Sequence, residues 1–442
     1  MRTPSAGDPA PAGPAAAAQR TEKGNTHAVT VLNELRMRPA TVGRREWDAA
    51  RRPRLLLTLA VMTTLLVGAN LATPLYPLLG VRLGLTHFGV TVAFAAYVVV
   101  LVAGLLLVGH WSDFIGRRAA LVLAGVVSLL GGVLFGTATS MEALIAGRAL
   151  QGASVALATG ASSAALRELL PHRPEWATRF TLMVSAGGVA AGPVIGGLLS
   201  LLPAPTLTPF LIHSVVLAGL LVPLCLLKAR PAIATPPLGR ALAALRPRRL
   251  AVSHQARSQF WMASVTGFLS FAVFGFYLSL APTYFAGIAG TSSRPVVGLL
   301  AALALAASAV SQLTGIRGRL VVPAGLALMG TGVALIPAAG ALGSVVLLVA
   351  ASLAAGFGQG MAFRAVFNDV AAKVEAAQHA QIISTVYVIT YLGSAIPVLG
   401  LGAAGAAWGL PAAVAWFSAA IALCCAALCL YALFRSLRSR RA

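Results

Sequence analysis

Charged side chains are scarce in this chain of 442 residues: Asp, Glu, Lys and Arg together make up only 10% of it, whereas a soluble domain carries about 25%. Hydrophobic residues make up 58%, and the mean hydropathy is +0.86. These values exclude a water-soluble fold. The apolar residues suffice for about twelve helices of the ~20 residues that a helix needs to cross a bilayer.

Acidic residues are few, and none of the eleven lies in the middle of an apolar segment. Membrane carriers of protons commonly use a carboxylate at mid-depth, and the sequence lacks one. It also lacks motifs such as HExxH, so no enzyme is expected. The four cysteines lie within apolar runs without metal-ligand spacing, so neither a disulfide framework nor a metal site is predicted. They are Cys225, Cys424, Cys425 and Cys429.

Apolar segments recur in two sets of six, separated by a basic linker at residues 228–258. The first set covers residues 55–79, 88–109, 119–138, 142–166, 180–201 and 209–227. The second covers residues 259–285, 295–315, 319–338, 342–366, 380–403 and 409–434. We therefore predict an all-α membrane protein of twelve transmembrane helices in two pseudo-symmetric bundles, residues 55–227 and 259–434. Residues 1–54 are predicted as a disordered cytoplasmic tail, and residues 435–442 as a short basic one.

The positions of the basic residues explain the net charge of +22. With a cytoplasmic N-terminus, all but three of the 33 Lys and Arg residues lie on the inner side. The exceptions are Arg82 and Arg294 outside and Arg148 within a span. This distribution follows the positive-inside rule and predicts a multi-pass protein of the cell membrane with both termini cytoplasmic. We therefore expect the lipid bilayer, not nucleic acid, as the partner of the basic residues.

The two halves contain similar short strings, which indicates an internal duplication of the kind that builds many transporters. Three matches appear in order. They pair Gln151-Gly152 with Gln359-Gly360, Pro193-Val-Ile-Gly196 with Pro397-Val-Leu-Gly400, and Gly109, Asp113 and Gly116 with Ser308, Gln312 and Gly315.

The loop after the second segment combines a close-packing glycine, an acid, a glycine turn and two arginines. It reads Gly109-His-Trp-Ser-Asp113-Phe-Ile-Gly116-Arg117-Arg118. This string resembles the signature loop of the major facilitator superfamily, although Phe114 stands where that family usually has a basic residue. The resemblance implies that Asp113 pairs with Arg117, faces the start of the eleventh helix near Gln381, and latches the cytoplasmic side shut. The alternative is a solvated turn.

The fourth segment carries an arginine, Arg148, followed by Gln151 and Gly152. An arginine inside a span costs roughly 2.5–3.5 kcal/mol on insertion scales, so it should face protein or a water-filled cavity. The alternative is that Arg148, only six residues after Glu142, snorkels to the outer interface. The string matches the motif of the superfamily on this helix, where the arginine is linked to proton coupling.

The fifth segment carries small residues at four-residue intervals around a proline: Gly188, Gly192, Pro193, Gly196 and Gly197. Such residues let helices approach closely, and Pro193 removes one backbone hydrogen bond from the helix. The string resembles the antiporter motif of the drug:proton exporters within the superfamily, with Arg179 in place of the usual upstream glycine. Ordinary glycine packing is the alternative.

Buried polar groups need partners in a bilayer, which makes Asn70, Gln359, Tyr387 and Tyr391 candidates to line a substrate cavity. Aromatic residues of the seventh segment either line the same cavity or face lipid and neighbouring helices. They are Phe268, Phe271, Phe274, Phe276 and Tyr277. His213 is expected to be a packed, neutral residue with a hydrogen bond to a neighbour.

The resemblance covers residues 55–434 and implies a monomeric secondary transporter that works by alternating access. We expect export of hydrophobic or amphipathic small molecules, such as drugs or secondary metabolites, in exchange for protons and without a bound cofactor. A proton-independent facilitator, or an importer of a sugar or organic acid, is the alternative within the same superfamily. A receptor or an intramembrane enzyme is the alternative outside it.

Overall fold

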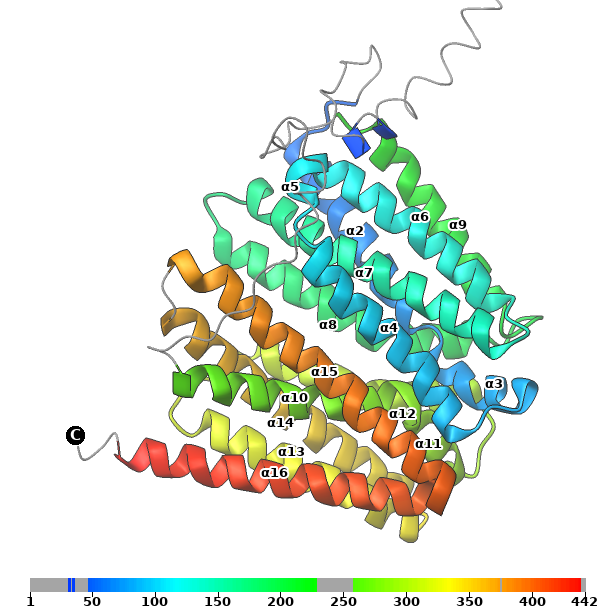
Figure 1. Cartoon of the computed structure of the whole chain (residues 1–442), viewed down its shortest axis with the longest axis vertical. Helices are drawn as coiled ribbons and strands as arrows, with labels where there is room; N and C mark the ends of the chain where they lie inside the picture. The colour runs from blue at the N-terminus through cyan, green and yellow to red at the C-terminus, as the bar shows by residue number, and fades with distance from the viewer. Residues whose placement is uncertain (1–30, 33, 36–46, 229–256, 374–375, 439–442) are drawn as a thin grey trace, which may run out of the picture.

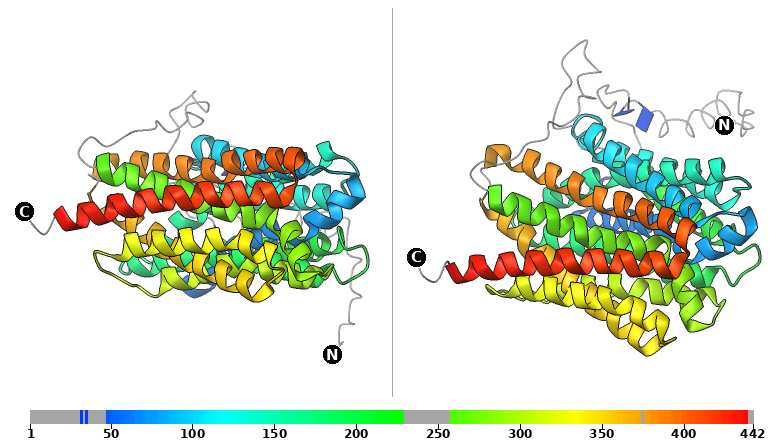
Figure 2. Two further views of the ribbon diagram at one scale, coloured as in Figure 1. Left: turned by 90° about the horizontal axis from the view of Figure 1, so that it is seen from below. Right: turned by 60° about the horizontal axis from the view of Figure 1, so that its bottom comes forward.

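The computed structural model describes residues 31–32, 34–35, 47–228, 257–373 and 376–438, which form two groups of helices lying side by side (Figure 1). Most of the predicted tail and linker, and the last four residues, lie outside the described residues. Blue to green helices form the N-terminal bundle, and green to red helices form the C-terminal bundle. The separate views in Figure 2 keep the long helices of both bundles roughly aligned, as helices that cross one membrane must be.

Each of the twelve predicted segments contains a long helix. The N-terminal bundle has α2 (Arg51–Asn70), η1 (Thr73–Leu75), α3 (Tyr76–Leu83), α4 (His87–Leu107), α5 (Ser112–Ile115), α6 (Arg117–Gly136), α7 (Met141–Leu169), α8 (Pro174–Leu199) and α9 (Thr208–Leu226). The C-terminal bundle has α10 (Arg257–Ser279), α11 (Ala281–Ala289), α12 (Arg294–Leu313), α13 (Val321–Ala341), α14 (Val345–Lys373), α15 (Ala376–Trp408) and α16 (Leu410–Arg438).

Eleven helical stretches of the described residues are long and apolar enough to cross a membrane, and α7 is not among them. Helix α7 nevertheless has 29 residues and packs against α4 and α6 within the N-terminal bundle. Neighbouring helices, rather than lipid, therefore surround much of it. Because protein surrounds α7, the intramembrane arginine costs less free energy there than it would in an isolated span.

The first and seventh predicted segments are interrupted, where the sequence suggested continuous helices. Helix α2 ends at Asn70 and the chain continues through η1 into α3, while α10 ends at Ser279 and continues as α11. Pro74 and Pro282 lie at these breaks. Because proline has no backbone N–H and clashes with the preceding turn, it ends a helix or begins a new one. The equivalent breaks in the two bundles support the internal duplication.

The described part of the predicted tail packs on the N-terminal bundle. Trp47 pairs with the end of α9, its N–H donating to the carbonyl of Leu226 at 2.8 Å and its carbonyl accepting from the N–H of Lys228 at 2.9 Å. Glu34 forms a buried ion pair with Arg118, which also donates to the carbonyl of Leu227. Helix α2 begins at Arg51, four residues before the predicted start.

The structure disagrees with one of the three sequence matches between the two halves of the chain. Helices α7 and α14 both have 29 residues, and Gly152 and Gly356 are each the twelfth. A Cβ on Gly152 would lie 2.3 Å from the carbonyl oxygen of Tyr97, and one on Gly356 would lie 2.0 Å from that of Ala304. Gly152 thus corresponds to Gly356, so the match to Gly360 was wrong by one helical turn. Small residues repeat every four positions here, which allows such a slip.

A small side chain at Gly68 is a requirement of the packing between α2 and α9. Its Cβ would lie 2.2 Å from Nε2 of His213, which contacts the carbonyl of Thr64 at 3.0 Å. We expect Gly68→Ala to lower the free energy of unfolding by about 1–3 kcal/mol through overpacking. The measurement is the thermal midpoint of the purified protein in detergent. Gly219→Ala on α9, where no atom lies within 4 Å of the added Cβ, is the control and should leave the midpoint unchanged.

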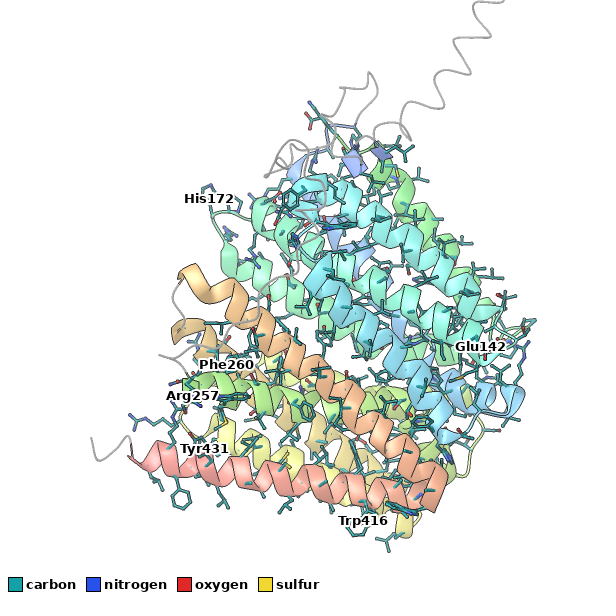
Figure 3. All side chains as sticks on the ribbon, in the orientation of Figure 1. Glu142, His172, Arg257, Phe260, Trp416 and Tyr431 are labelled. Carbon is teal, nitrogen blue, oxygen red and sulfur yellow. The ribbon has the colours of Figure 1, made fainter. Side chains whose placement is uncertain are left out.

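Several contacts between the two bundles lie at one end of the molecule. At this end Arg294 of α12 donates to the carbonyl of Ser200 at 2.9 Å and to its hydroxyl at 3.0 Å. Figure 3 marks this end by Glu142 and the opposite end by His172 and Arg257. The charge distribution predicts that the Glu142 end faces outward. The bundles are therefore held together at the end predicted to be outside.

Candidate functional site

Helix α7 presents Arg148 two turns after its beginning. The hydroxyl of Ser140 caps the helix by accepting from the N–H of Ala143 at 3.3 Å, a standard device at a helix start. A hydrogen bond with Ser140, and one with the backbone, lower the pKa of the exposed Glu142 carboxyl. The carboxylate therefore stays ionised beside the positive end of the helix dipole.

The Arg148 side chain turns into the bundle and is only 2% exposed. Its Nη1 donates to the backbone carbonyl of Ala69 at 2.6 Å and to Oε1 of Gln151 at 2.7 Å. The guanidinium carbon lies 4.4 Å from the centroid of the Tyr97 ring, a cation–π contact. The structure therefore favours the buried position over an arginine that snorkels to the interface.

Several donors around Arg148 have no hydrogen-bond partner within the described chain. They are Nε of Arg148, Nε2 of Gln151 and the hydroxyl of Tyr76. Tyr76 is buried and begins α3, seven residues after Ala69, whose carbonyl accepts from Arg148. Each unpaired buried donor costs about 1–3 kcal/mol. Three such donors around one cation make this cluster the strongest candidate for a ligand site in the N-terminal bundle.

The C-terminal bundle carries no cation at the equivalent place. The register of α7 and α14 sets Ser352 opposite Arg148, and the Ser352 hydroxyl accepts from the hydroxyl of Tyr277 at 2.8 Å. Gln359 lies two turns further on, where it accepts from the Ser308 hydroxyl. Its position is in a polar network within the C-terminal bundle, which also includes Gln312 at 3.0 Å from Ser308. Nothing described brings Gln359 to Arg148.

Asn70 and the glycines of α8 lie beside the Arg148 cluster. The Asn70 amide donates to the carbonyl of Leu66 at 2.8 Å, within its own helix. A Cβ on Gly192 would lie 2.4 Å from Cβ of Asn70. The predicted cavity residue is thus held in place by the glycine string, one residue after the carbonyl of Ala69 that Arg148 binds.

Aromatic rings from three helices of the C-terminal bundle form a continuous row. Phe271 of α10 contacts Phe363 of α14 at 5.9 Å and Tyr391 of α15 at 5.1 Å between ring centroids. Tyr391 contacts Tyr387 at 6.4 Å, and Tyr387 contacts Phe367 at 5.0 Å. We call these five residues the aromatic row. Tyr387 is 37% exposed, so the row keeps a surface for a ligand.

The other aromatic residues of α10 divide between two roles. Phe274 packs on Phe271 with ring centroids 6.0 Å apart. Phe276 and Tyr277 are fully buried and stack against Phe285. The seventh segment therefore supplies both the aromatic row and the core, as residues on different faces of one helix must.

The signature loop forms an ion-pair network inside the N-terminal bundle. Nη1 of Arg117 lies 2.5 Å from Oδ1 of Asp113, and Nε of Arg117 lies 2.8 Å from Oε1 of Glu168 at the end of α7. Gly116 has a φ of 87°, which favours glycine. The carbonyl of Gly109 packs against α7 at Gly160, because a Cβ on Gly160 would lie 2.2 Å from the Gly109 carbonyl oxygen. The Gln381 side chain, the expected latch partner, lies outside the described residues.

Arg118 takes no part in the network around Asp113. Its guanidinium binds Glu34 and the carbonyls of Cys225 and Leu227. Neighbouring residues of a helix point about 100° apart, so Arg117 and Arg118 contact different partners. Arg118 instead binds the end of α9, and Gly109, Asp113, Gly116 and Arg117 remain as candidates for a latch.

We expect Asp113→Asn to reduce transport about three- to tenfold without changing membrane abundance. The carboxylate is 40% exposed, so the lost ion pair biases a conformational equilibrium by on the order of 1 kcal/mol and removes no packing. Initial transport rates, normalised to protein in the membrane, measure the effect. Asp48→Asn, which removes a 72% exposed carboxylate paired with Arg54, is the matched control. Equal rates in both variants would make Asp113 a solvated turn residue.

The glycine-proline string of α8 contacts both bundles. A Cβ on Gly188 would lie 2.8 Å from Cβ of Leu66 in α2, and one on Gly196 would lie 2.3 Å from the carbonyl oxygen of Leu71. On another face of α8, a Cβ on Gly197 would lie 2.6 Å from the carbonyl oxygen of Arg294 in α12. The string therefore packs α8 on its own bundle and closes the contact to the other one.

Helix α12 contributes a glycine of its own to this contact between the bundles. A Cβ on Gly298 would lie only 2.2 Å from the carbonyl oxygen of Pro193. Pro193, near the C-terminal end of α8, leaves the backbone free of one helical hydrogen bond. Backbone meets backbone there without an intervening side chain. A joint built from small residues can separate without unpacking large side chains.

Comparison with known proteins agrees with this geometry. A family model of the Major Facilitator Superfamily matches residues 57–396. The chain belongs to this superfamily. Over 116 residues it is 39% identical to the tetracycline resistance protein, class E, of Escherichia coli, a match that covers 25% of this chain and 27% of that protein. Over 92 residues it is 38% identical to the MFS-type transporter TwmF of Talaromyces wortmannii, covering 21% and 17%. The chain thus matches only about a quarter or less of these relatives.

Solved structures of superfamily members share the fold. A bacterial homologue of the human lysosomal transporter Spinster, in an inward-facing and unoccupied conformation, aligns over 88% of this chain and 97% of its own with a TM-score of 0.66 and 15% identity. The nucleoside transporter NupG aligns over 86% and 100% with a TM-score of 0.68 and 13% identity. At these identities the solved structures show that the chain has the fold of the superfamily.

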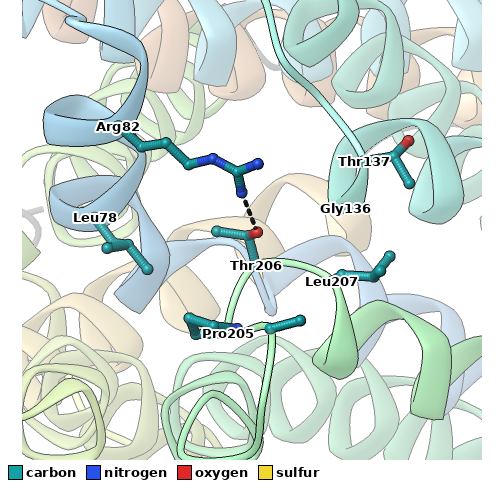
Figure 4. A pocket seen from close by; sticks show the side chains of 8 residues that line it. Leu78, Arg82, Gly136, Thr137, Pro205, Thr206 and Leu207 are labelled. Carbon is teal, nitrogen blue, oxygen red and sulfur yellow. Dashed lines mark hydrogen bonds between the residues drawn. The ribbon is translucent and has the colours of Figure 1, made fainter.

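The structure has a small cavity at the end predicted to be outside. It has a volume of about 260 Å³ and lies between α3 and the loop before α9. Arg82 donates to the Thr206 hydroxyl at 2.8 Å beside it (Figure 4). The cavity lies within the N-terminal bundle, away from Arg148 and the aromatic row. Arg82 therefore fixes an outer loop.

Sequence reasoning missed two residues of the candidate site, Tyr76 and Tyr97. Both are tyrosines within apolar segments, where an aromatic residue usually packs against lipid or another helix. Tyr97 lies twelve residues before Gly109, where the signature loop begins. It is on α4, whose packing on α7 the sequence does not show. For Tyr76 the sequence offered one signal: a tyrosine hydroxyl within an apolar segment needs a hydrogen-bond partner.

Proposed function

We propose that this chain exports hydrophobic or amphipathic small molecules, such as drugs or secondary metabolites, across the cell membrane by alternating access. The observation that carries the proposal is the joint between Pro193 of α8 and Gly298 of α12, where the two bundles meet through backbone at one end. Such a joint suits two bundles that rock against each other around a central site. Export, rather than import, is supported by the likeness of the α8 string to the antiporter motif and by the tetracycline resistance protein among the relatives.

Proton exchange is part of the proposal and takes its support from the motifs of α7 and α8. The chain offers no carboxylate in the middle of a span, so protons must be carried at Asp113, at His213 or on the transported molecule. The second candidate is a proton-independent facilitator, which the missing carboxylate favours. We place both termini in the cytoplasm, on the positive-inside rule, and expect a monomer to suffice.

Inside-out vesicles with and without the protein separate these candidates. Tetracycline serves as the first probe, and its accumulation is measured with an imposed pH gradient, acidic inside, and then without one. A proton-coupled exporter accumulates the probe only with the gradient, and loses the accumulation when a protonophore is added. Equilibration at the same rate under both conditions identifies a facilitator. Accumulation in right-side-out vesicles instead would contradict the proposed direction.

A further inference from the structure

The cluster around Arg148 has a surplus of hydrogen-bond donors and no acid. Arg148, Gln151 and Tyr76 each carry a buried donor without a partner inside the part of the chain that the structure describes. The charge of Arg148 is met by two neutral oxygens, those of Ala69 and Gln151. All eleven acidic residues of the sequence lie outside the middle of the spans. The part of the chain that the structure describes therefore supplies no anion to this site.

We propose that the Arg148 cluster binds the anionic group of the transported molecule, a carboxylate or a similar oxyanion. The donors have the chemistry for it, because a guanidinium, an amide N–H and a phenol O–H all donate to oxyanions and none competes with them. A bound anion gives the buried cation a partner of opposite charge in a medium of low dielectric constant. The inference rests on the proposed transport function and names its substrate class.

The aromatic row provides a surface for the rest of the molecule. Tyr97, whose ring lies 4.4 Å from the guanidinium carbon, packs against the same hydrophobic cluster as Tyr391 of the row. The rings thus lead from the cation in the N-terminal bundle to apolar surface in the C-terminal bundle. The substrate that fits is an aromatic or amphipathic organic anion, with its charge at Arg148 and its rings against Tyr391.

The equivalent position in the C-terminal bundle is uncharged, so the site carries charge on one side only. Ser352, the counterpart of Arg148, is neutral and uses its hydroxyl to accept from Tyr277. Only the N-terminal bundle therefore holds the charge, and a molecule with one anionic group binds in one orientation. A dianion with charges at both ends would leave one of them unpaired.

A matched pair of probes tests the charge directly. Radiolabelled 1-naphthoate and 1-naphthamide share their rings and differ in charge, and binding of each to the purified full chain in lipid nanodiscs is measured by equilibrium dialysis. We expect naphthoate to bind at least tenfold more tightly than naphthamide. Arg148→Gln should remove this preference, and Arg148→Lys should keep part of it. Arg82→Gln, which removes an arginine bound to Thr206 elsewhere, is the control and should bind as the wild type does.

Chloride titration distinguishes an organic from an inorganic anion. Naphthoate that still binds in 0.3 M sodium chloride supports an organic anion site, whereas its complete displacement at millimolar chloride would make this an inorganic ion site and contradict the substrate class. Equal binding of the two probes by the wild type, or unchanged naphthoate binding by Arg148→Gln, would also overturn the inference. The wild-type comparison decides even where the variant fails to fold. Failure of the proposed export shows separately, as binding without vesicle transport.

Discussion

Replacing Arg148 with alanine is expected to reduce transport at least about a hundredfold, to the level of vesicles without the protein. The side chain donates to Ala69 and Gln151 and stacks on Tyr97, so its loss removes the cation and the group that orients two neighbours. A hundredfold loss corresponds to about 2.7 kcal/mol, within the range for a buried charged hydrogen-bond donor that contacts a ligand. Transport rates normalised to membrane abundance measure it.

The same variant should remain folded. No acid faces Arg148 at mid-depth, so alanine leaves no unpaired charge behind, and the thermal midpoint in detergent should change little. Arg148→Lys should recover only part of the rate, because lysine keeps the charge but loses the planar head with several donors. Full activity of Arg148→Ala would remove the site assignment, and a protein that fails to insert would assign Arg148 to folding.

The second large effect is expected from a side chain at the joint between the bundles. Gly298→Val places a Cβ 2.2 Å from the carbonyl oxygen of Pro193, and the opposing atom is backbone, which cannot rotate away. The end that carries Arg294 and Ser200 should then be unable to close. We expect transport to fall about a hundredfold while the other conformation of the protein persists.

Cysteine labelling reports the opening directly. Ser200 is fully buried, so Ser200→Cys should react slowly with a membrane-impermeant maleimide in the wild type and at least tenfold faster in Gly298→Val. Gly287→Val on α11 is the matched control, because no atom lies within 4 Å of its added Cβ. Slow labelling in the Gly298→Val protein together with normal transport would show that the joint tolerates a side chain.

Much of the fold follows from the sequence, because runs of apolar residues and the location of charges have few solutions in a bilayer. The twelve segments and their division around residues 228–258 were readable for this reason. The breaks at Pro74 and Pro282 were readable in principle, since proline ends helices, yet the hydropathy runs continue through them. The separate roles of Arg117 and Arg118 also follow from helix geometry alone.

Other features depend on packing that the sequence does not display. Small residues repeat every four positions on α7 and α14, so the sequence match slipped by one turn and paired Gly152 with Gly360. Tyr97 joins Arg148 only because α4 packs on α7. Tyr76 follows the break at the end of α2, and α2 also packs on α7. The sequence showed the members of the aromatic row only as separate aromatic residues. It could not show which aromatic residues of α10 join the row and which, like Phe276 and Tyr277, lie in the core, because this depends on which face of α10 meets α14 and α15.

Distance measurements at both ends of the molecule test alternating access most directly. Spin labels replace Leu202 and Ser292 at the end that carries Arg294, and His172 and Thr314 at the other end, in a background without the native cysteines. Each pair spans the two bundles, and pulsed electron resonance gives its distance distribution across a series of pH values and with 1-naphthoate. We predict that the two pairs change in opposite directions, and that Gly298→Val removes the short distance between positions 202 and 292. Distances that stay fixed at both ends, or that lengthen and shorten together, would contradict the account.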